Sequence, residues 1–138
     1  MKYLLSLCLL LLSSVSFASE NLVVVVPKNS AITSLNNVDV ANIFLARTNR
    51  FPNGDKSVPL ELKTGELRTD FYKNISGKTP RQLMSYWTTL VFTGKGRPPK
   101  SYSNYEELKQ KFANVHGAIT YVDISQVTEE MRIVYKFP

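Results

Sequence analysis

A polar stretch from Lys63 to Arg68 contains residue types that could hold a small anion. Thr64 offers a hydroxyl, Gly65 follows it, and Arg68 adds a positive charge. The stretch leads into a segment with helical apolar spacing, and a helix N-terminus supplies unpaired N–H groups and partial positive charge. We therefore predict that Thr64, Gly65 and Arg68 contact an anionic ligand or partner.

The same residues have a structural alternative, which stays open at this point. Thr64 would then serve only as the helix cap, and Glu66 would complement the helix dipole. Arg68 would be a solvated or structural ion-pair residue rather than a ligand contact. The sequence alone does not choose between the two interpretations.

A second candidate is the basic loop from Thr93 to Lys100, which combines glycines and prolines with Lys95, Arg97 and Lys100. It lacks the spacing of a nucleotide-binding phosphate loop, and it follows a helix rather than a strand. The composition predicts a rigid, basic surface loop. Such a loop is either a plain connector or a docking loop for an acidic partner surface.

The sequence contains no arrangement typical of an enzyme or a metal site. His116 is the only histidine, and it has no evident partner for general-base or metal chemistry. The acidic pairs at 106–107 and 129–130 are adjacent residues, which diverge by about 100° on a helix and do not converge on one site. We expect no catalytic residue, no metal and no cofactor.

The first 18 residues have the pattern of a cleavable secretory signal peptide. Lys2 forms the positive end, Leu4–Leu12 the apolar stretch, and Ser16–Ala18 the small-residue cleavage site. The single cysteine, Cys8, lies inside the apolar stretch and not at the cleavage point, so we expect neither a lipid anchor nor a disulfide. The expectation is a periplasmic protein without a stable membrane anchor, whose mature domain spans residues 19–138.

The charge balance favours anionic partners. The chain has 17 Lys and Arg against 11 Asp and Glu, a formal net charge of +6. Phosphate groups, anionic lipid and acidic protein faces all fit this balance. The basic residues are scattered rather than run together, so we expect no nucleic-acid partner.

Four strands and four helices are expected to position these residues. Apolar runs predict strands at 22–26, 58–62, 118–122 and 131–136. Capping residues predict four helices, which begin after Asn36, Thr64, Thr79 and Ser103. The first helix is expected to end at Ala46, the second at Gly77 and the fourth at Gly117. Apolar stripes follow helical spacing and comprise Val40, Ile43 and Phe44; Leu67, Phe71 and Ile75; Leu83, Trp87, Leu90 and Val91; and Tyr105, Leu108 and Phe112. Alternating strands and helices predict an α/β domain with a mixed or parallel sheet flanked by helices.

Several short motifs occur in a characteristic order along nearly the whole mature chain. They are Val38–Leu45, Phe51–Gly54, Arg68–Tyr72, Tyr86-Trp87 with Phe92–Gly96 and Pro98-Pro99, and Gly117–Val122. Together they resemble the phosphate-binding-protein family of ABC importers, within the type 2 periplasmic-binding fold. The resemblance implies a single lobe of that fold, similar to short stand-alone members.

The resemblance also bears on the anion site and on function. The family's site uses a Ser/Thr-rich, glycine-containing loop that leads into a helix, and the corresponding stretch here is Lys63–Arg68. It lacks the family's Ser-Gly-Thr run and places Glu66 where an anion would sit. The sequence therefore supports a non-enzymatic binding or interaction module with an envelope protein partner. The alternative is a solute-binding component that captures phosphate or another small anion for an ABC importer.

Overall fold

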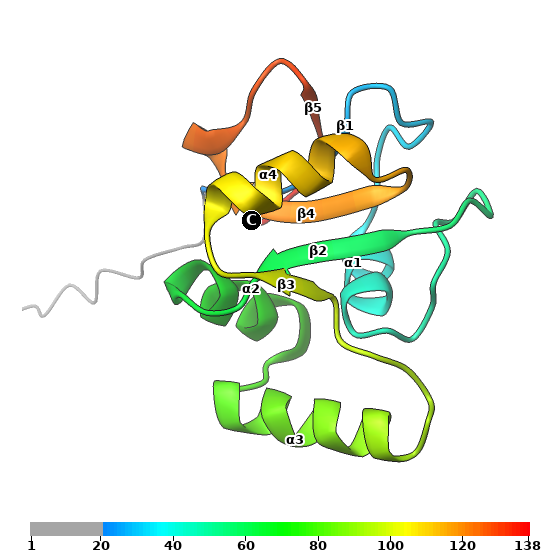
Figure 1. The fold of residues 1–138 in the computed structure, drawn as a ribbon, viewed down its shortest axis with the longest axis vertical. Helices are drawn as coiled ribbons and strands as arrows, with labels where there is room; N and C mark the ends of the chain where they lie inside the picture. Colours follow the sequence, from blue (N-terminus) through cyan, green and yellow to red (C-terminus); the bar gives the residue numbers. More distant parts are fainter. Residues whose placement is uncertain (1–20) are drawn as a thin grey trace, which may run out of the picture.

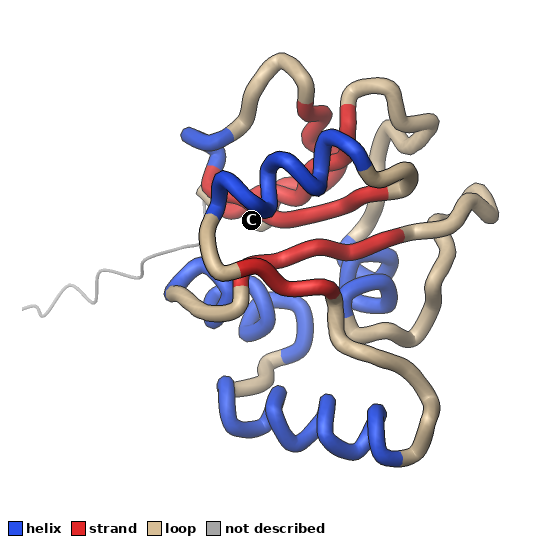
Figure 2. The backbone as a smooth tube through the Cα atoms, in the orientation of Figure 1, coloured by secondary structure: helices blue, strands red, loops and turns tan. Residues whose placement is uncertain are grey.

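The computed structural model describes residues 21–138, so the expected signal peptide and Cys8 lie outside the described residues. Five strands form one mixed sheet in the order β3-β2-β4-β1-β5 (Figures 1 and 2). The strands are β1 (Leu22–Pro27), β2 (Val58–Leu62), β3 (Lys100–Tyr102), β4 (Ala118–Asp123) and β5 (Met131–Lys136). The helices are α1 (Asn37–Phe44), α2 (Glu66–Ser76), α3 (Pro80–Phe92), α4 (Tyr105–Asn114) and the short 3₁₀ helix η1 (Ile124–Gln126). The predicted α/β class with a mixed sheet flanked by helices is confirmed.

The direction of the strands decides where polar groups can gather. β2 runs parallel to both β3 and β4, whereas β1 is antiparallel to β4 and β5. The carboxyl ends of β2 and β4 therefore lie at the same edge of the sheet. In α/β sheets this edge, next to the helix N-termini, is where ligands usually bind.

The central strand β1 is buried on both faces, and its alternation separates two cores. Leu22, Val24 and Val26 face a core shared with α1, α2 and α3, while Val23 and Val25 face a core shared with α4. In Figure 1, α4 accordingly lies on one face of the sheet and α1 and α2 on the other. Because both faces are covered, β1 can be a continuous β-branched run.

Most of the predicted elements are confirmed. The four predicted strands are present, and Asn36 caps α1 through a capping box with Asp39. Thr79 caps α3 through a capping box with Gln82, and Gly77 ends α2 in the left-handed conformation. These local signals decide the helix ends because each satisfies backbone groups that the helix leaves unpaired.

Several predictions at element ends are wrong. The first helix ends at Phe44 and not at Ala46, which adopts φ +55°. Asn104 caps α4 in place of Ser103, because its side chain accepts from the N–H of Glu107. α4 ends at Asn114, three residues before Gly117.

Two further differences from the predicted structure concern Val91 on α3 and the strand β3, which follows that helix. Val91 was expected in the apolar stripe of the third helix, but it is 53% exposed. The sequence also gave no signal for β3 (Lys100–Tyr102), whose three residues pair in parallel with β2. A strand this short is defined by its neighbour rather than by its own pattern.

Within the described part of the chain, no helix is long and apolar enough to cross a bilayer.

Gly117 lies just before β4, where the chain passes close to the start of the parallel strand β2. It has φ +81°, a Cβ there would collide with the Lys56 carbonyl oxygen, and its own carbonyl accepts from the Val58 N–H at 2.8 Å. We predict that Gly117→Ala destabilises the protein by about 2 kcal/mol or more, from positive-φ strain together with the collision. Urea unfolding measures this change.

Gly54→Ala is the matched control for that substitution. Gly54 also has a positive φ, +92°, but its Cβ would meet nothing within 4 Å. We expect a smaller loss, of about 1 kcal/mol, from the backbone strain alone. Equal losses in the two variants would contradict the proposed close approach at Gly117.

Candidate functional site

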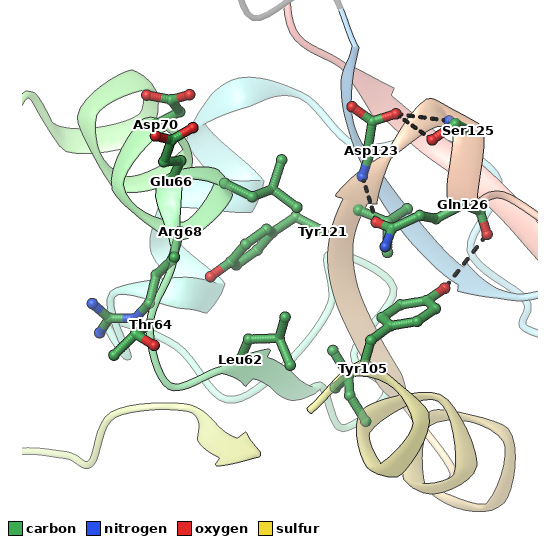
Figure 3. A pocket seen from close by; sticks show the side chains of 14 residues that line it. Leu62, Thr64, Glu66, Arg68, Asp70, Tyr105, Tyr121, Asp123, Ser125 and Gln126 are labelled. Carbon is green, nitrogen blue, oxygen red and sulfur yellow. Dashed lines mark hydrogen bonds between the residues drawn. The ribbon is translucent and has the colours of Figure 1, made fainter. Parts of the chain in front are cut away.

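A groove of about 500 Å³ lies at the carboxyl ends of β2 and β4. Its floor is apolar and aromatic, and its rim is polar (Figure 3). The floor includes Leu62, Leu67, Leu108, Val122, Tyr105 and Tyr121, and the rim includes Thr64, Gly65, Glu66, Arg68, Asp70, Asp123, Ser125 and Gln126. The structure therefore brings the predicted anion-contact residues Thr64, Gly65 and Arg68 to one groove.

Arg68 is engaged with a carboxylate that the sequence analysis did not single out. Its Nε donates to Glu61 Oε2 at 3.3 Å, and its guanidinium lies over the Tyr72 ring, 5.1 Å from the ring centroid. Glu61 belongs to β2 and is 2% exposed, so this ion pair sits beneath the groove. This contact agrees with the structural interpretation of Arg68, in which it is an ion-pair residue rather than a ligand contact.

Two tyrosine hydroxyls complete the surroundings of Glu61. Tyr72 from α2 donates to Glu61 Oε1 at 2.6 Å, and Tyr121 from β4 donates to the same oxygen at 3.1 Å. Both carboxylate oxygens therefore have partners. A buried carboxylate is tolerated only when it is hydrogen-bonded in this way.

Burial controls the protonation of this cluster. Desolvation raises the pKa of Glu61 above its ordinary value, and the Tyr72 hydrogen bond and the Arg68 charge oppose it only in part. Desolvation, followed by the charge of Glu61, also raises the pKa of Tyr72 and Tyr121. The tyrosines therefore remain protonated donors at neutral pH.

The N-terminus of α2 is open to the groove. Gly65, with φ 126°, is the N-cap residue, and no side chain caps the helix. The prediction that Thr64 caps it is wrong, because the chain enters the helix one residue later through a glycine that has no side-chain acceptor. By contrast, the described helices α1, α3 and α4 all have side-chain caps.

The rim of the groove is nevertheless acidic. Glu66 and Asp70 lie one turn apart on α2, and Asp123 ends β4 (Figure 3). Hydrogen bonds from the Ser125 hydroxyl and backbone N–H lower the pKa of Asp123, so it is ionised at neutral pH. The described residues that line the groove include three carboxylates and one cation, Arg68.

The predicted docking residues lie elsewhere. Lys95 and Arg97 lie in the loop after α3, and Lys100 is the first residue of β3; all three are exposed, and none lines the groove. The start of this loop is fixed, since the Lys95 N–H donates to the Leu90 carbonyl at 3.0 Å. The two sets of predicted site residues therefore form two separate surfaces.

His116 is exposed, and within residues 21–138 no group of three His, Cys, Asp or Glu side chains could hold a metal ion. The residue missed by sequence reasoning is Glu61. The signal available was a single acid between Leu60 and Leu62 in an otherwise apolar strand, seven residues before Arg68. A charge in such a strand requires a partner from the helix that covers it.

The comparisons with known proteins concern the fold. No protein-family model matches the chain, and no curated protein does. Among solved structures, similar chains include a phosphate ABC transporter substrate-binding protein from Clostridium perfringens with bound phosphate (TM-score 0.62, 15% identity). Others are an ABC-type phosphate transport receptor from Vibrio cholerae (TM-score 0.63, 13% identity) and a protein from Planctomyces limnophilus described as a possible phosphate binding protein (TM-score 0.58, 14% identity).

The lengths covered define the class of fold. The matches cover 83%, 86% and 83% of this chain but only 44%, 47% and 40% of the respective solved chains. The chain thus has the fold of one lobe of a type 2 periplasmic-binding protein and spans less than half the length of each similar structure. At these identities the likeness establishes the fold alone.

The Arg68–Glu61 pair gives a prediction about stability. Arg68→Met keeps the apolar stem but leaves Glu61 without its charge partner, and we expect a loss of about 2 kcal/mol in the free energy of unfolding. Lys109→Met is the control, because the Lys109–Glu106 pair is exposed, at 42% and 72% for the two side chains. Its loss should stay below about 1 kcal/mol. Similar losses in both urea titrations would contradict a buried pair.

The raised pKa of Glu61 gives a second prediction. A carboxyl whose folded pKa lies above its unfolded value near 4.5 contributes stability below that pH and loses it as pH rises through the folded pKa. Glu61→Gln removes this dependence, so its stability relative to the parent protein should increase as pH rises from about 4.5 toward neutrality. Urea unfolding of both proteins across this range measures the difference. A difference that decreases or stays constant would show that the pKa is not raised.

Proposed function

We propose that this chain is a non-enzymatic, periplasmic binding or interaction module that uses one lobe of the substrate-binding-protein fold. The observation that carries the proposal is the charge arrangement at the groove. Arg68 is paired with buried Glu61, and the rim adds the carboxylates of Glu66, Asp70 and Asp123. This arrangement opposes the capture of an anion, because the three rim carboxylates would repel its charge.

The groove fits a protein segment better than a free anion. Its apolar floor can bury aliphatic or aromatic side chains, and its acidic rim can pair with Lys or Arg. The partner we propose is therefore an envelope protein that presents a basic and apolar segment. In this proposal, the exposed residues Lys95, Arg97 and Lys100 form a second, separate docking surface of the opposite charge.

A specific observation favours the alternative, the capture of phosphate or another small anion for an ABC importer. The α2 N-terminus has no side-chain cap, Thr64 lies beside it, and Arg68 makes one hydrogen bond through Nε, so its other N–H groups remain available. Two of the similar structures are named as phosphate transport proteins, and one of these contains bound phosphate. Both candidates can be separated by calorimetry.

We predict no saturable phosphate or sulfate binding to the parent protein below millimolar concentration. The variant Glu66→Gln, Asp70→Asn, Asp123→Asn removes the rim charges and should gain at least about tenfold in phosphate affinity, since each removed carboxylate lowers the repulsion. Isothermal titration measures both. The control is Glu107→Gln, Glu129→Gln, Glu130→Gln, which changes the net charge equally outside the groove and should gain nothing. Micromolar phosphate binding by the parent protein would favour the importer function.

Site-specific photo-crosslinking tests the interaction role directly. A photo-reactive amino acid at Ser125, on the groove rim, should give one discrete protein adduct in the envelope of the producing cell. The same group at Lys73, which is exposed on α2 but does not line the groove, is the control. No adduct at Ser125, or equal adducts at both positions, would contradict a groove partner.

A further inference from the structure

α3 exposes three large apolar side chains to solvent, among polar residues that include Ser85 and Thr88. Met84, Val91 and Phe92 are 70%, 53% and 92% exposed. With 3.6 residues per turn, Met84 and Val91 point in nearly the same direction and Phe92 lies about 100° further round. Leu83 and Trp87 pack on the core. Phe92 lies about 140° or more from both of them around the helix, whereas Met84 and Val91 lie about 40° to 60° from Trp87. α3 therefore has a core-facing apolar stripe, and exposed apolar side chains extend from the edge of that stripe to the solvent side.

Cations flank these exposed side chains at both ends of α3. Arg81 lies in the first turn of α3, and Lys95, Arg97 and Lys100 follow its last turn; all four are exposed and none has an ion pair within the described residues. Residues 78–100 contain five Lys or Arg and no Asp or Glu. The segment that carries the exposed apolar side chains therefore has a net positive charge.

The position of α3 leaves these side chains accessible to a broad surface. α3 lies across one end of the molecule, away from the sheet (Figure 1). The start of the basic loop is held at the end of the helix, because the Gly94 N–H donates to the Val91 carbonyl at 3.1 Å and the Lys95 N–H to the Leu90 carbonyl at 3.0 Å. The backbone of Lys95 is therefore fixed next to the last turn of α3, while Arg97 lies further along the loop and Lys100 begins β3.

We propose that this end of the molecule docks on an anionic lipid surface. Phe92, Met84 and Val91 would enter the boundary between headgroups and acyl chains, while Arg81, Lys95, Arg97 and Lys100 contact lipid phosphates. Helices with one apolar face and flanking cations bind membrane surfaces in this way, and each basic residue near an anionic bilayer adds to the attraction. A second copy of the chain is a poor occupant, because it would bring the same four cations together. The inference extends the docking role proposed for Lys95, Arg97 and Lys100 and does not depend on the groove.

Vesicle co-sedimentation tests the proposal with the full chain as isolated from cells. We expect binding to vesicles of equal parts phosphatidylglycerol and phosphatidylcholine, weakened by salt, and little binding to pure phosphatidylcholine. Phe92→Ser should lower the partition coefficient by about tenfold or more, and so should Lys95→Glu with Arg97→Glu. All variants share the same N-terminus, so their differences report on the α3 end.

Matched controls lie on other parts of the chain. Val38→Ser removes an apolar side chain of α1 that is 64% exposed, and Lys28→Glu with Lys111→Glu reverses two exposed charges away from α3. Each should bind within about twofold of the parent protein, since neither surface faces the bilayer. Phe92→Trp should give a blue shift in emission on phosphatidylglycerol vesicles, beyond any change from Trp87.

The outcomes separate this proposal from the groove function. Absence of binding to phosphatidylglycerol vesicles, or equal losses in the α3 and control variants, would overturn lipid docking. Protein crosslinks at Phe92 without vesicle binding would replace the lipid with an acidic protein partner and also overturn it. An adduct at Ser125 in the same cells would leave the proposed groove function standing.

Discussion

The Glu61 carboxylate must keep its hydrogen-bond donors, because a buried charge without them would cost several kcal/mol. This single constraint fixes three elements. Tyr72 and Arg68 come from α2, Tyr121 comes from β4, and Glu61 itself comes from β2. The edge of the sheet where ligands are expected is thus also the place where the fold carries its buried charge cluster.

The same constraint shapes the surface above it. With Arg68 directed toward Glu61, the acidic side chains of Glu66, Asp70 and Asp123 dominate the rim of the groove. Residues 78–100, which include α3, instead contain five Lys or Arg and no Asp or Glu. The molecule therefore has two surfaces of opposite charge, which favours contacts with two different kinds of partner.

Local sequence signals were enough to predict the α/β class, four of the five strands and two of the four helix caps. Asn36 and Thr79 were recognised because a capping side chain satisfies nearby backbone groups. Thr64 was misread because a cap depends on the dihedral angles of the following glycine, which the sequence does not state. β3 was not predicted, because its three residues form a strand only by pairing with β2.

The candidate site was predictable in part for similar reasons. The placement of Thr64, Gly65 and Arg68 at one groove followed from the order of strand and helix. The partnership of Glu61 with Tyr121 did not, because sixty positions in the sequence separate them and only the β2–β4 pairing brings them together. The exposure of Val91 and Phe92 could not be predicted, because the helical spacing of apolar residues does not show which of them contact the core.

The function of the groove depends most directly on whether the Arg68 charge is paired with Glu61 or with a ligand. The Arg68 Nε–H resonance in a ¹⁵N-resolved NMR spectrum reports on this, because that group donates to Glu61. We expect a resonance that shifts in Glu61→Gln and stays unchanged when phosphate is added to millimolar concentration. A saturable shift of the Arg68 resonance at micromolar phosphate would contradict the account and place the anion at this guanidinium.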